Sequence, residues 1–179
     1  TPATGLSGTA TITLTVDDSN GGTATETFDI TIPPLNDAPT ISAIADQTIA
    51  EDGNTGALTF TLADADGDTL TVTGSSSDTT LIPDANIVVA GTGASRTVTV
   101  TPAADQSGTA TITLTIDDGN GGTITETFDV TVTPVNDAPT ISAIANQTIA
   151  EDGNTGALAF TLADTDGDTL TVTGSSSNT

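Results

Sequence analysis

The chain has 179 residues, with 24 acidic side chains against one basic side chain, Arg96, and a net charge of −23. Nucleic acid is excluded as a partner because binding to phosphates needs a Lys/Arg patch, and an anionic membrane surface is disfavoured for the same reason. The absence of Cys, His, Met, Trp and Tyr excludes zinc sites, disulfides and Cys–His or Ser–His nucleophiles.

Short runs in which apolar residues alternate with Thr predict β-strands, because successive side chains of a strand point to opposite faces. In chain order, we expect strands at residues 40–44, 47–49, 58–63, 69–73, 87–90, 96–101, 109–116 and 123–132. The Asp-, Asn- and Gly-rich residues 117–122 predict a hairpin turn between the last two strands. No segment has a helical period.

The inward positions of these strands predict the hydrophobic core. The expected core residues are Leu58, Phe60, Leu62, Leu70, Val72, Val98, Val100, Ile112, Leu114, Phe128, Val130 and Val132. Glu126 breaks the pattern, because uninterrupted alternation would turn this acidic side chain inward. Either a bulge or a rim position carries it to water, or Glu126 is an extra metal ligand.

The sequence repeats itself with a period of 100 residues: Asn36-Asp37 returns as Asn136-Asp137. Residues 1–79 and 101–179 are identical at 65 of 79 positions. We therefore expect residues 1–35 to be the C-terminal part of one repeat, 36–135 a complete repeat, and 136–179 the N-terminal part of the next. We therefore expect the chain to be one part of a longer array of repeats. A period near 100 with many short strands predicts an all-β fold of tandem seven-stranded Greek-key sandwiches.

Greek-key topology predicts that the acidic turns gather where consecutive repeats meet. We expect the first junction to collect Asn36, Asp37, Asp64, Asp66, Asp68, Asp117, Asp118 and Asn120. The second is expected to collect Glu51, Asp52, Asp105, Asn136, Asp137, Asp164, Asp166 and Asp168. Clustered carboxylates repel unless a cation lies among them, and Ca²⁺ accepts 6–8 oxygen ligands in flexible geometry. Calcium is thus the expected cofactor. Ordinary solvated turns are the alternative interpretation.

The junction residues resemble those of a known family. The sequence Pro134-Val135-Asn136-Asp137-Ala138-Pro139 resembles the linker of cadherin repeats and of the cadherin-like, Ig-like repeats in giant bacterial surface adhesins. In that family an inter-repeat calcium site combines an exit-end glutamate, an Asn-Asp linker and an Asp-x-Asp sequence. Glu51, Asn136-Asp137 and Asp164-x-Asp166 match these parts in order. The resemblance implies cadherin-like sandwiches that bind calcium outside the cell.

These features predict a calcium-stiffened stalk of a bacterial cell-surface adhesin or fibre, with neighbouring repeats as its partners and no insertion into a membrane. Two alternatives remain open. Thr-x-Thr ladders favour a glycan- or ice-binding module, and strand complementation between copies favours a subunit of a polymeric filament. An enzyme is not expected, because the paired carboxylates lie in turns without an apolar pocket to raise a pKa.

Overall fold

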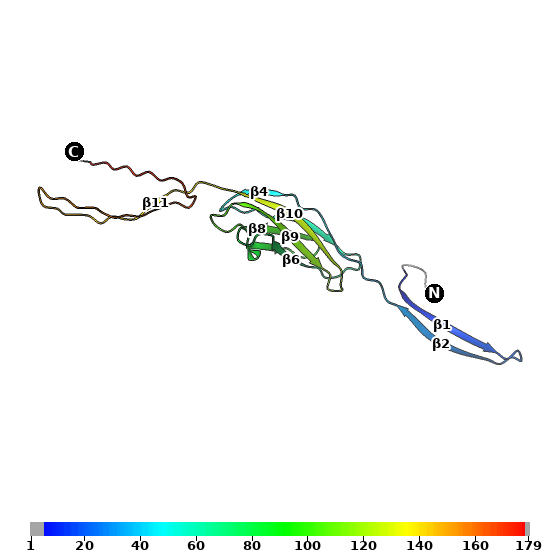
Figure 1. Ribbon diagram of the computed structural model, residues 1–179. Helices are drawn as coiled ribbons and strands as arrows, with labels where there is room; N and C mark the ends of the chain where they lie inside the picture. Colours follow the sequence, from blue (N-terminus) through cyan, green and yellow to red (C-terminus); the bar gives the residue numbers. More distant parts are fainter. Residues whose placement is uncertain (1–5, 178–179) are drawn as a thin grey trace.

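A computed structural model describes residues 6–177 of the chain. A hairpin, a central sandwich and an extended C-terminal segment follow one another along an elongated molecule (Figure 1). The described residues contain no α-helix, and the predicted all-β fold is confirmed. The elements are β1 (Gly8–Asp17), β2 (Thr23–Ile32), β3 (Thr40–Ile41), β4 (Gln47–Ala50), β5 (Leu58–Ala63), β6 (Thr71–Ser76), the short 3-10 helix η1 (Asp84–Asn86), β7 (Ile87–Ala90), β8 (Ser95–Val100), β9 (Gly108–Asp117), β10 (Thr123–Thr133), β11 (Thr140–Ile141) and β12 (Leu162–Ala163).

The central sandwich, residues 36–135, consists of two four-stranded sheets. One sheet has the strand order β4-β10-β9-β6, and the other has the order β3-β5-β8-β7. Strands β9 and β10 show why the sequence folds in this way: aliphatic residues alternate with Thr, and only the aliphatic face is fully buried. Each strand therefore presents one apolar face to the opposite sheet and one hydroxyl-rich face to water.

The first strand of the sandwich is divided between the two sheets. Strand β3 pairs antiparallel with β5, whereas β4 pairs parallel with β10 along Val130 to Thr133. Counted as one, β3 and β4 complete the seven strands of a Greek-key sandwich. The predicted strand at residues 40–44 ends earlier, at Ile41, because the chain crosses here from one sheet to the other and buries Ile44 on the way.

Strand β6 also differs from the prediction, which placed it at residues 69–73. It runs from Thr71 to Ser76 and pairs with β9 over its whole length. The sequence Gly-Ser-Ser predicts a loop, yet Gly74 is needed inside the strand. A Cβ atom at this position would lie 2.5 Å from the Cγ2 atom of Ile87, so any larger residue would clash with that side chain.

The core lies between the two sheets of the central sandwich. Nine of the twelve predicted core residues are buried, and Leu58, Leu70 and Val72 pack against them with partial exposure. The buried core also holds residues that the strand pattern did not predict, namely Ile44, Leu81, Ile82, Ile87, Ala110 and Ile116. No helix among the described residues combines the length and the hydropathy that crossing a membrane requires.

Glu126 lies on the inward face of β10, and no bulge accompanies it. The ladder between β9 and β10 runs without interruption and places Glu126 opposite Leu114. The Glu126 side chain instead accepts a hydrogen bond from the backbone N–H of Ile44, with a donor–acceptor distance of 3.0 Å. The carboxylate thus satisfies a backbone donor in the crossing between β3 and β4. Glu126 thus holds the crossing of the divided first strand, and it lies outside the acidic groups that the described residues form.

Replacing Glu126 tests whether its hydrogen bond with the Ile44 N–H stabilises the fold. We expect Glu126→Ala to lower the free energy of unfolding by about 1–3 kcal/mol, because the Ile44 N–H then loses its acceptor in a partly buried position. Glu126→Gln keeps an acceptor oxygen and should cost less. Urea denaturation of both variants measures the difference. Equal losses in the two variants would show that the hydrogen bond does not stabilise the fold.

Candidate metal centres

The acidic side chains gather at the two ends of the central sandwich. We call the end where residues 36–37 enter the upstream end, and the end where residues 134–137 leave the downstream end. At the upstream end, one carboxylate oxygen from each of Asp64, Asp68 and Asp118 lies within 4.8 Å of the others. The first two residues flank the turn between β5 and β6, and the third opens the turn between β9 and β10.

Backbone hydrogen bonds fold the turn after β5 around Asp64. Its Oδ1 atom accepts the N–H groups of Asp66 and Asp68, at 2.9 and 3.1 Å. Gly67, at a φ of +80°, supplies the left-handed conformation that closes the turn. Two oxygens remain without a donor. The Oδ2 atoms of Asp64 and Asp68 are buried and have no hydrogen-bond partner in the described structure.

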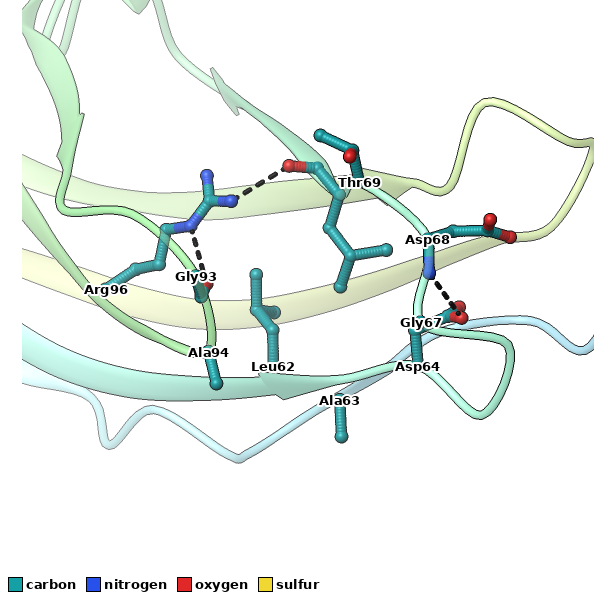
Figure 2. Close-up of a pocket in the computed structure, with 10 residues that line it drawn as sticks. Leu62, Ala63, Asp64, Gly67, Asp68, Thr69, Gly93, Ala94 and Arg96 are labelled. Carbon is teal, nitrogen blue, oxygen red and sulfur yellow. Dashed lines mark hydrogen bonds between the residues drawn. The ribbon is translucent and has the colours of Figure 1, made fainter.

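A cavity of about 490 Å³ adjoins this turn, and its lining includes Asp64, Asp68 and Arg96 (Figure 2). Arg96 does not neutralise the two carboxylates. Its guanidinium group donates to the carbonyl oxygens of Leu70 and Gly93, at 2.9 and 3.2 Å. The only basic side chain of the sequence is therefore engaged with backbone carbonyls, and the two buried oxygens have no hydrogen-bond partner in the described structure.

Asp118 ties the upstream end to the linker. This side chain is buried, and its Oδ1 atom accepts the N–H groups of Asn120 and Gly122 at 2.7 and 2.9 Å. Its Oδ2 atom accepts the side-chain amide of Asn36 at 2.8 Å. The packing leaves no room at Gly122, where a Cβ atom would lie 2.1 Å from Asp118 Oδ2 and 2.8 Å from the Cα atom of Ala38.

The second linker residue, Asp37, is also held by a hydrogen bond to an aspartate side chain. The Oδ2 atom of Asp66 accepts the N–H of Asp37 at 2.7 Å, and Asp166 repeats this contact with Asp137 at 2.6 Å. Asp66, Asp68, Asn36 and Asn120 line a hollow of about 320 Å³ beside the linker. The aspartate in the middle of each Asp-x-Asp-x-Asp sequence thus fixes the approach of the chain to the repeat.

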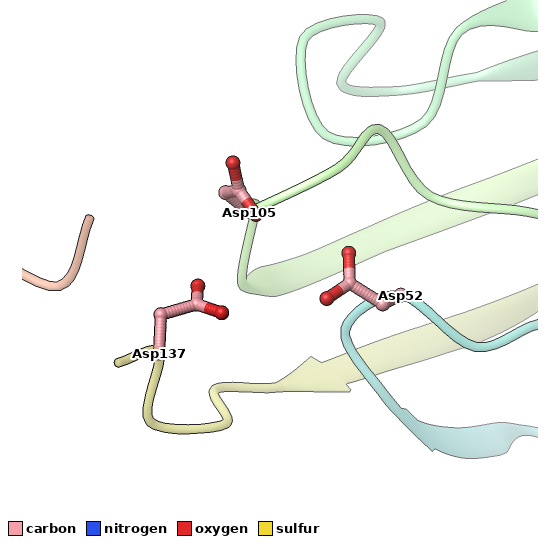
Figure 3. A group of neighbouring side chains, drawn as sticks. All are labelled: Asp52, Asp105 and Asp137. Atoms are coloured by element: carbon pink, nitrogen blue, oxygen red, sulfur yellow. The ribbon is translucent and has the colours of Figure 1, made fainter. Parts of the chain in front are cut away.

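The downstream end carries a second acidic group, formed by Asp52, Asp105 and Asp137 (Figure 3). Asp52 and Asp105 both adopt left-handed backbone conformations, at φ of +62° and +56°. Burial, followed by the negative charges of Asp105, Asp166, Asp52 and Glu51, raises the pKa of Asp137. The ionised form of Asp137 is therefore less favoured than that of a solvated aspartate.

The remaining predicted site residues have separate places. Asp164, Asp166 and Asp168 form a third group in the C-terminal segment. Glu51 is buried and accepts the N–H of Val135. Asn136 donates to the carbonyl of Asp137 at 2.9 Å. Asp117 is outside the acidic groups and accepts the N–H of Gly119 at 2.6 Å, which is the hydrogen bond of a local turn.

All ligand atoms that converge at these ends are oxygens, most of them carboxylate oxygens. Such a set suits a hard divalent cation, and buried carboxylates without donors are the groups that most need one. The sequence did not indicate that Asn36 would bind Asp118, or that Glu51 would cap a backbone N–H. No residue pattern distinguishes a carboxylate that binds backbone from one that is left open.

Comparisons with known proteins place the fold. No curated protein matches the chain. The sequence profile of the bacterial Ig domain family matches residues 36–131. The chain belongs to the bacterial Ig domain family. The matched residues cover the central sandwich from the linker to residue 131 in β10, so that this sandwich is one bacterial Ig domain.

The solved structures that resemble the chain include a surface-layer protein and a domain of titin. The bacterial Ig domain chain is 23% identical to domains 4 and 5 of the S-layer protein SbsC, with a TM-score of 0.35, and the match covers 70% of this chain and 59% of that one. The titin M3 domain is 12% identical, with a TM-score of 0.40, and the match covers 52% of this chain and 95% of that one. These likenesses concern the fold alone.

The hydrogen bond between Asn36 and Asp118 in this bacterial Ig domain has a measurable effect. The Asn36 amide, with the backbone N–H groups of Asn120 and Gly122, holds the pKa of Asp118 below its ordinary value, against the opposing effect of burial. We expect Asn36→Ala to raise the pKa of Asp118 in calcium-free protein. The pKa of Asp18 serves as the control, because it is lowered by the N–H groups of Asn20 and Gly22 and should not change. NMR titration of the carboxyl groups measures both.

The pH dependence of stability follows from the same shift. A lowered pKa in the folded state contributes stability that is complete above the unfolded-state pKa of Asp118 and is lost as the pH falls through the folded-state pKa. Asn36→Ala should therefore destabilise the domain near neutral pH and have little effect in strong acid. A pKa of Asp118 that is unchanged in the variant would contradict the role given to Asn36.

Proposed function

We propose that the chain is an extender segment of a bacterial extracellular surface protein, in which calcium bound at the ends of each Ig domain stiffens the array. One observation carries the proposal: the Oδ2 atoms of Asp64 and Asp68 are buried without a hydrogen-bond partner, and these two side chains form an acidic group with Asp118. Leaving buried charges unpaired is costly, and a bound cation removes that cost.

Calcium fits these groups better than other metals. Its coordination by 6–8 oxygens at flexible angles can use carboxylates, amide oxygens, backbone carbonyls and water together. Magnesium requires stricter octahedral geometry and keeps its own waters. Zinc prefers nitrogen and sulfur ligands, and the sequence contains neither His nor Cys.

The stiffening follows from the place of Asp137 between two repeats. Its carboxylate faces Asp52 and Asp105 of the central domain, while its backbone N–H is held by Asp166 of the next repeat. Without a cation, the repulsion among these acids opposes a fixed angle at the linker. With calcium, the same acids become shared ligands, and the junction is held from both sides.

The location and the adhesive role rest on other grounds. Membership of the bacterial Ig domain family supports a bacterial surface protein, and the linker resemblance to cadherin-like adhesin repeats supports an adhesin stalk. Calcium modules outside the cell bind with a Kd of about 10⁻⁴–10⁻³ M, which matches an environment rich in calcium. Nearly identical repeats suit a stalk, because every junction makes the same contacts.

Small-angle X-ray scattering tests the stiffening. In millimolar calcium we expect a larger maximum dimension and a rod-like profile, and in EDTA a shorter, flexible particle with a hinge at residues 136–137. Asp137→Asn should remain flexible in calcium. Asp129→Asn is the matched control, because Asp129 lies on the outer face of β10 and is exposed; it should respond to calcium like the wild type. Identical profiles with and without calcium would rule out the proposal.

A Thr-rich outer face also provides a second candidate function, binding of glycan or ice. Three hydroxyl groups of this face already have side-chain partners: Thr109 pairs with Thr131 at 3.1 Å, and Thr111 donates to a carboxylate oxygen of Asp129 at 2.7 Å. These pairs reduce the number of hydroxyls that face a ligand. A glycan array or an ice-shaping assay on the whole chain separates this candidate from the extender.

A further inference from the structure

The turn between β9 and β10 contains an asparagine followed directly by a glycine, Asn120-Gly121. This order matters chemically, because the backbone nitrogen after an asparagine can attack the side-chain carbonyl carbon of that asparagine and close a five-membered ring. A glycine places no Cβ atom beside the attacking nitrogen and lets the backbone rotate into the required geometry. An Asn-Gly pair is therefore the dipeptide in which the attack is least hindered.

The fold leaves both partners of this attack accessible. Asn120 and Gly121 are exposed, and Gly121 has a φ of +105°, a conformation that residues with a side chain rarely adopt. Apart from its two chain neighbours, no part of the protein lies within 4 Å of the place where a Cβ atom of Gly121 would be. The peptide unit between the two residues thus has room to turn.

Hydrogen bonds to Asp118 hold the turn on either side of the attacking nitrogen. The Oδ1 atom of Asp118 accepts the N–H groups of Asn120 and Gly122 at 2.7 and 2.9 Å. Among the groups that lower the pKa of Asp118, the Asn36 amide has the largest effect and the Gly121 N–H has the smallest. The nitrogen that must attack is thus the most weakly held backbone donor of this turn, while both its neighbours are fixed.

We propose that Asn120-Gly121 is a site of spontaneous deamidation, which converts the Asn120 amide to a carboxylate at the upstream end of the domain. The Gly121 nitrogen loses its proton to the solvent and forms a bond to the Cγ atom of Asn120. The bond from Cγ to Nδ2 breaks, and ammonia leaves with a proton taken from water. Water then opens the five-membered succinimide at one of its two carbonyl groups, which gives aspartate or isoaspartate. Water is the only co-reactant.

The new carboxylate joins acids that are already present. Asn120 lines the hollow of about 320 Å³ together with Asp66, Asp68 and Asn36. Aspartate at position 120 brings one further negative charge and an anionic oxygen ligand to this hollow. Isoaspartate instead adds a CH2 group to the main chain and displaces the N–H groups that bind Asp118. The gain for a cation rests on the calcium binding proposed above, whereas the deamidation itself does not.

Mass spectrometry with peptide mapping tests the deamidation on the 179-residue chain in EDTA. During incubation in mildly alkaline buffer, the peptide that contains Asn120 should gain about 1 Da, the difference between NH2 and OH, and part of it should contain isoaspartate. The rate should rise about tenfold per pH unit, because hydroxide removes the proton of the attacking nitrogen. Asn54 is the internal control, because it is equally exposed but is followed by Thr55.

Asn120→Gln is the blocking variant, because its longer side chain would need a six-membered ring. The peptide of this variant should keep its mass throughout the incubation. A wild-type Asn120 peptide that changes no faster than the Asn54 peptide would overturn the proposal. A mass gain in the Asn120→Gln peptide at the wild-type rate would overturn it as well.

Asn120→Asp has the charge of the aspartate product from the start and tests the consequence for a cation. In calorimetric titration, we expect this variant to bind calcium at the upstream end roughly fivefold more tightly than Asn120→Gln, as one added charge acting across water would give. Equal affinities would overturn the effect on the cation. A lack of calcium binding in both variants and the wild type would contradict the proposed function, and the mass change at Asn120 would still stand.

Discussion

We expect the central domain to melt at a clearly higher temperature in millimolar calcium than in EDTA. A cation that binds only the folded state adds RT ln(1 + [L]/Kd), which is about 0.4–1.4 kcal/mol per site when calcium is at one to ten times Kd. For a domain of roughly 100 residues, 1 kcal/mol shifts the melting temperature by about 4–8 °C. The expected rise is therefore roughly 2–11 °C for each site, and it adds up where a domain has sites at both ends.

One substitution separates calcium from other causes of the rise. Asp64→Asn should remove most of the calcium dependence contributed by the upstream end. In EDTA the same variant should melt at the wild-type temperature or above it, because a neutral amide relieves the repulsion among Asp64, Asp68 and Asp118. Asp129→Asn should behave like the wild type in both buffers. A wild-type melting curve that does not respond to calcium would leave the acidic groups as ordinary solvated turns.

Replacing Phe128 by Ala should destabilise the central domain by about 3–5 kcal/mol, a large part of the total stability of a domain of this size. Phe128 is one of two aromatic side chains in the core and lies opposite Ile112 on the neighbouring strand. The remaining core residues are aliphatic. Such a core has few large side chains that could fill the cavity left by the Phe128 ring. The loss of stability should therefore be near the upper end of that range.

The chain contains its own control for this substitution. Phe28 occupies the equivalent position in β2, in the same local sequence, but its ring is largely exposed. Phe28→Ala should change the urea midpoint of the central domain little when measured on dilute protein. Equal losses from Phe28→Ala and Phe128→Ala would contradict the role given to Phe128, because an exposed ring outside the central domain would then matter as much as a buried one inside it.

Much of the fold is predictable from the alternation of Thr with aliphatic residues. This pattern predicts β9 and β10 to within one residue at each end, because a strict period of two has no other regular interpretation. It does not predict Leu81 and Ile82, which enter the core from an irregular segment before η1 without any periodic neighbours. It also places the first strand wrongly, since the switch of β3 and β4 between sheets depends on tertiary contacts such as the one from Glu126 to Ile44.

The sequence predicts which acidic turns lie close together in the candidate site, but not which of their oxygens are free to bind a ligand. Topology alone indicates that the turns containing Asp64 and Asp118 lie at one end and those containing Asp52 and Asp105 at the other. Which oxygens stay open is a matter of local hydrogen bonds. Asp117 and Asp118 are adjacent in sequence, yet only Asp118 is buried, where it accepts hydrogen bonds from Asn36, Asn120 and Gly122.

The parallel pairing of β4 with β10 determines how the domain responds to tension. A pull on the two ends of the central domain applies force at residue 36 and at residue 135, and hence at the first and last strands. Parallel strands loaded in this way slide along each other, so that their hydrogen bonds carry the load together instead of opening one by one. The four-residue pairing from Val130 to Thr133, together with the contacts of Glu126 with Ile44 and Glu51 with Val135, is therefore the part of each domain that resists being pulled open.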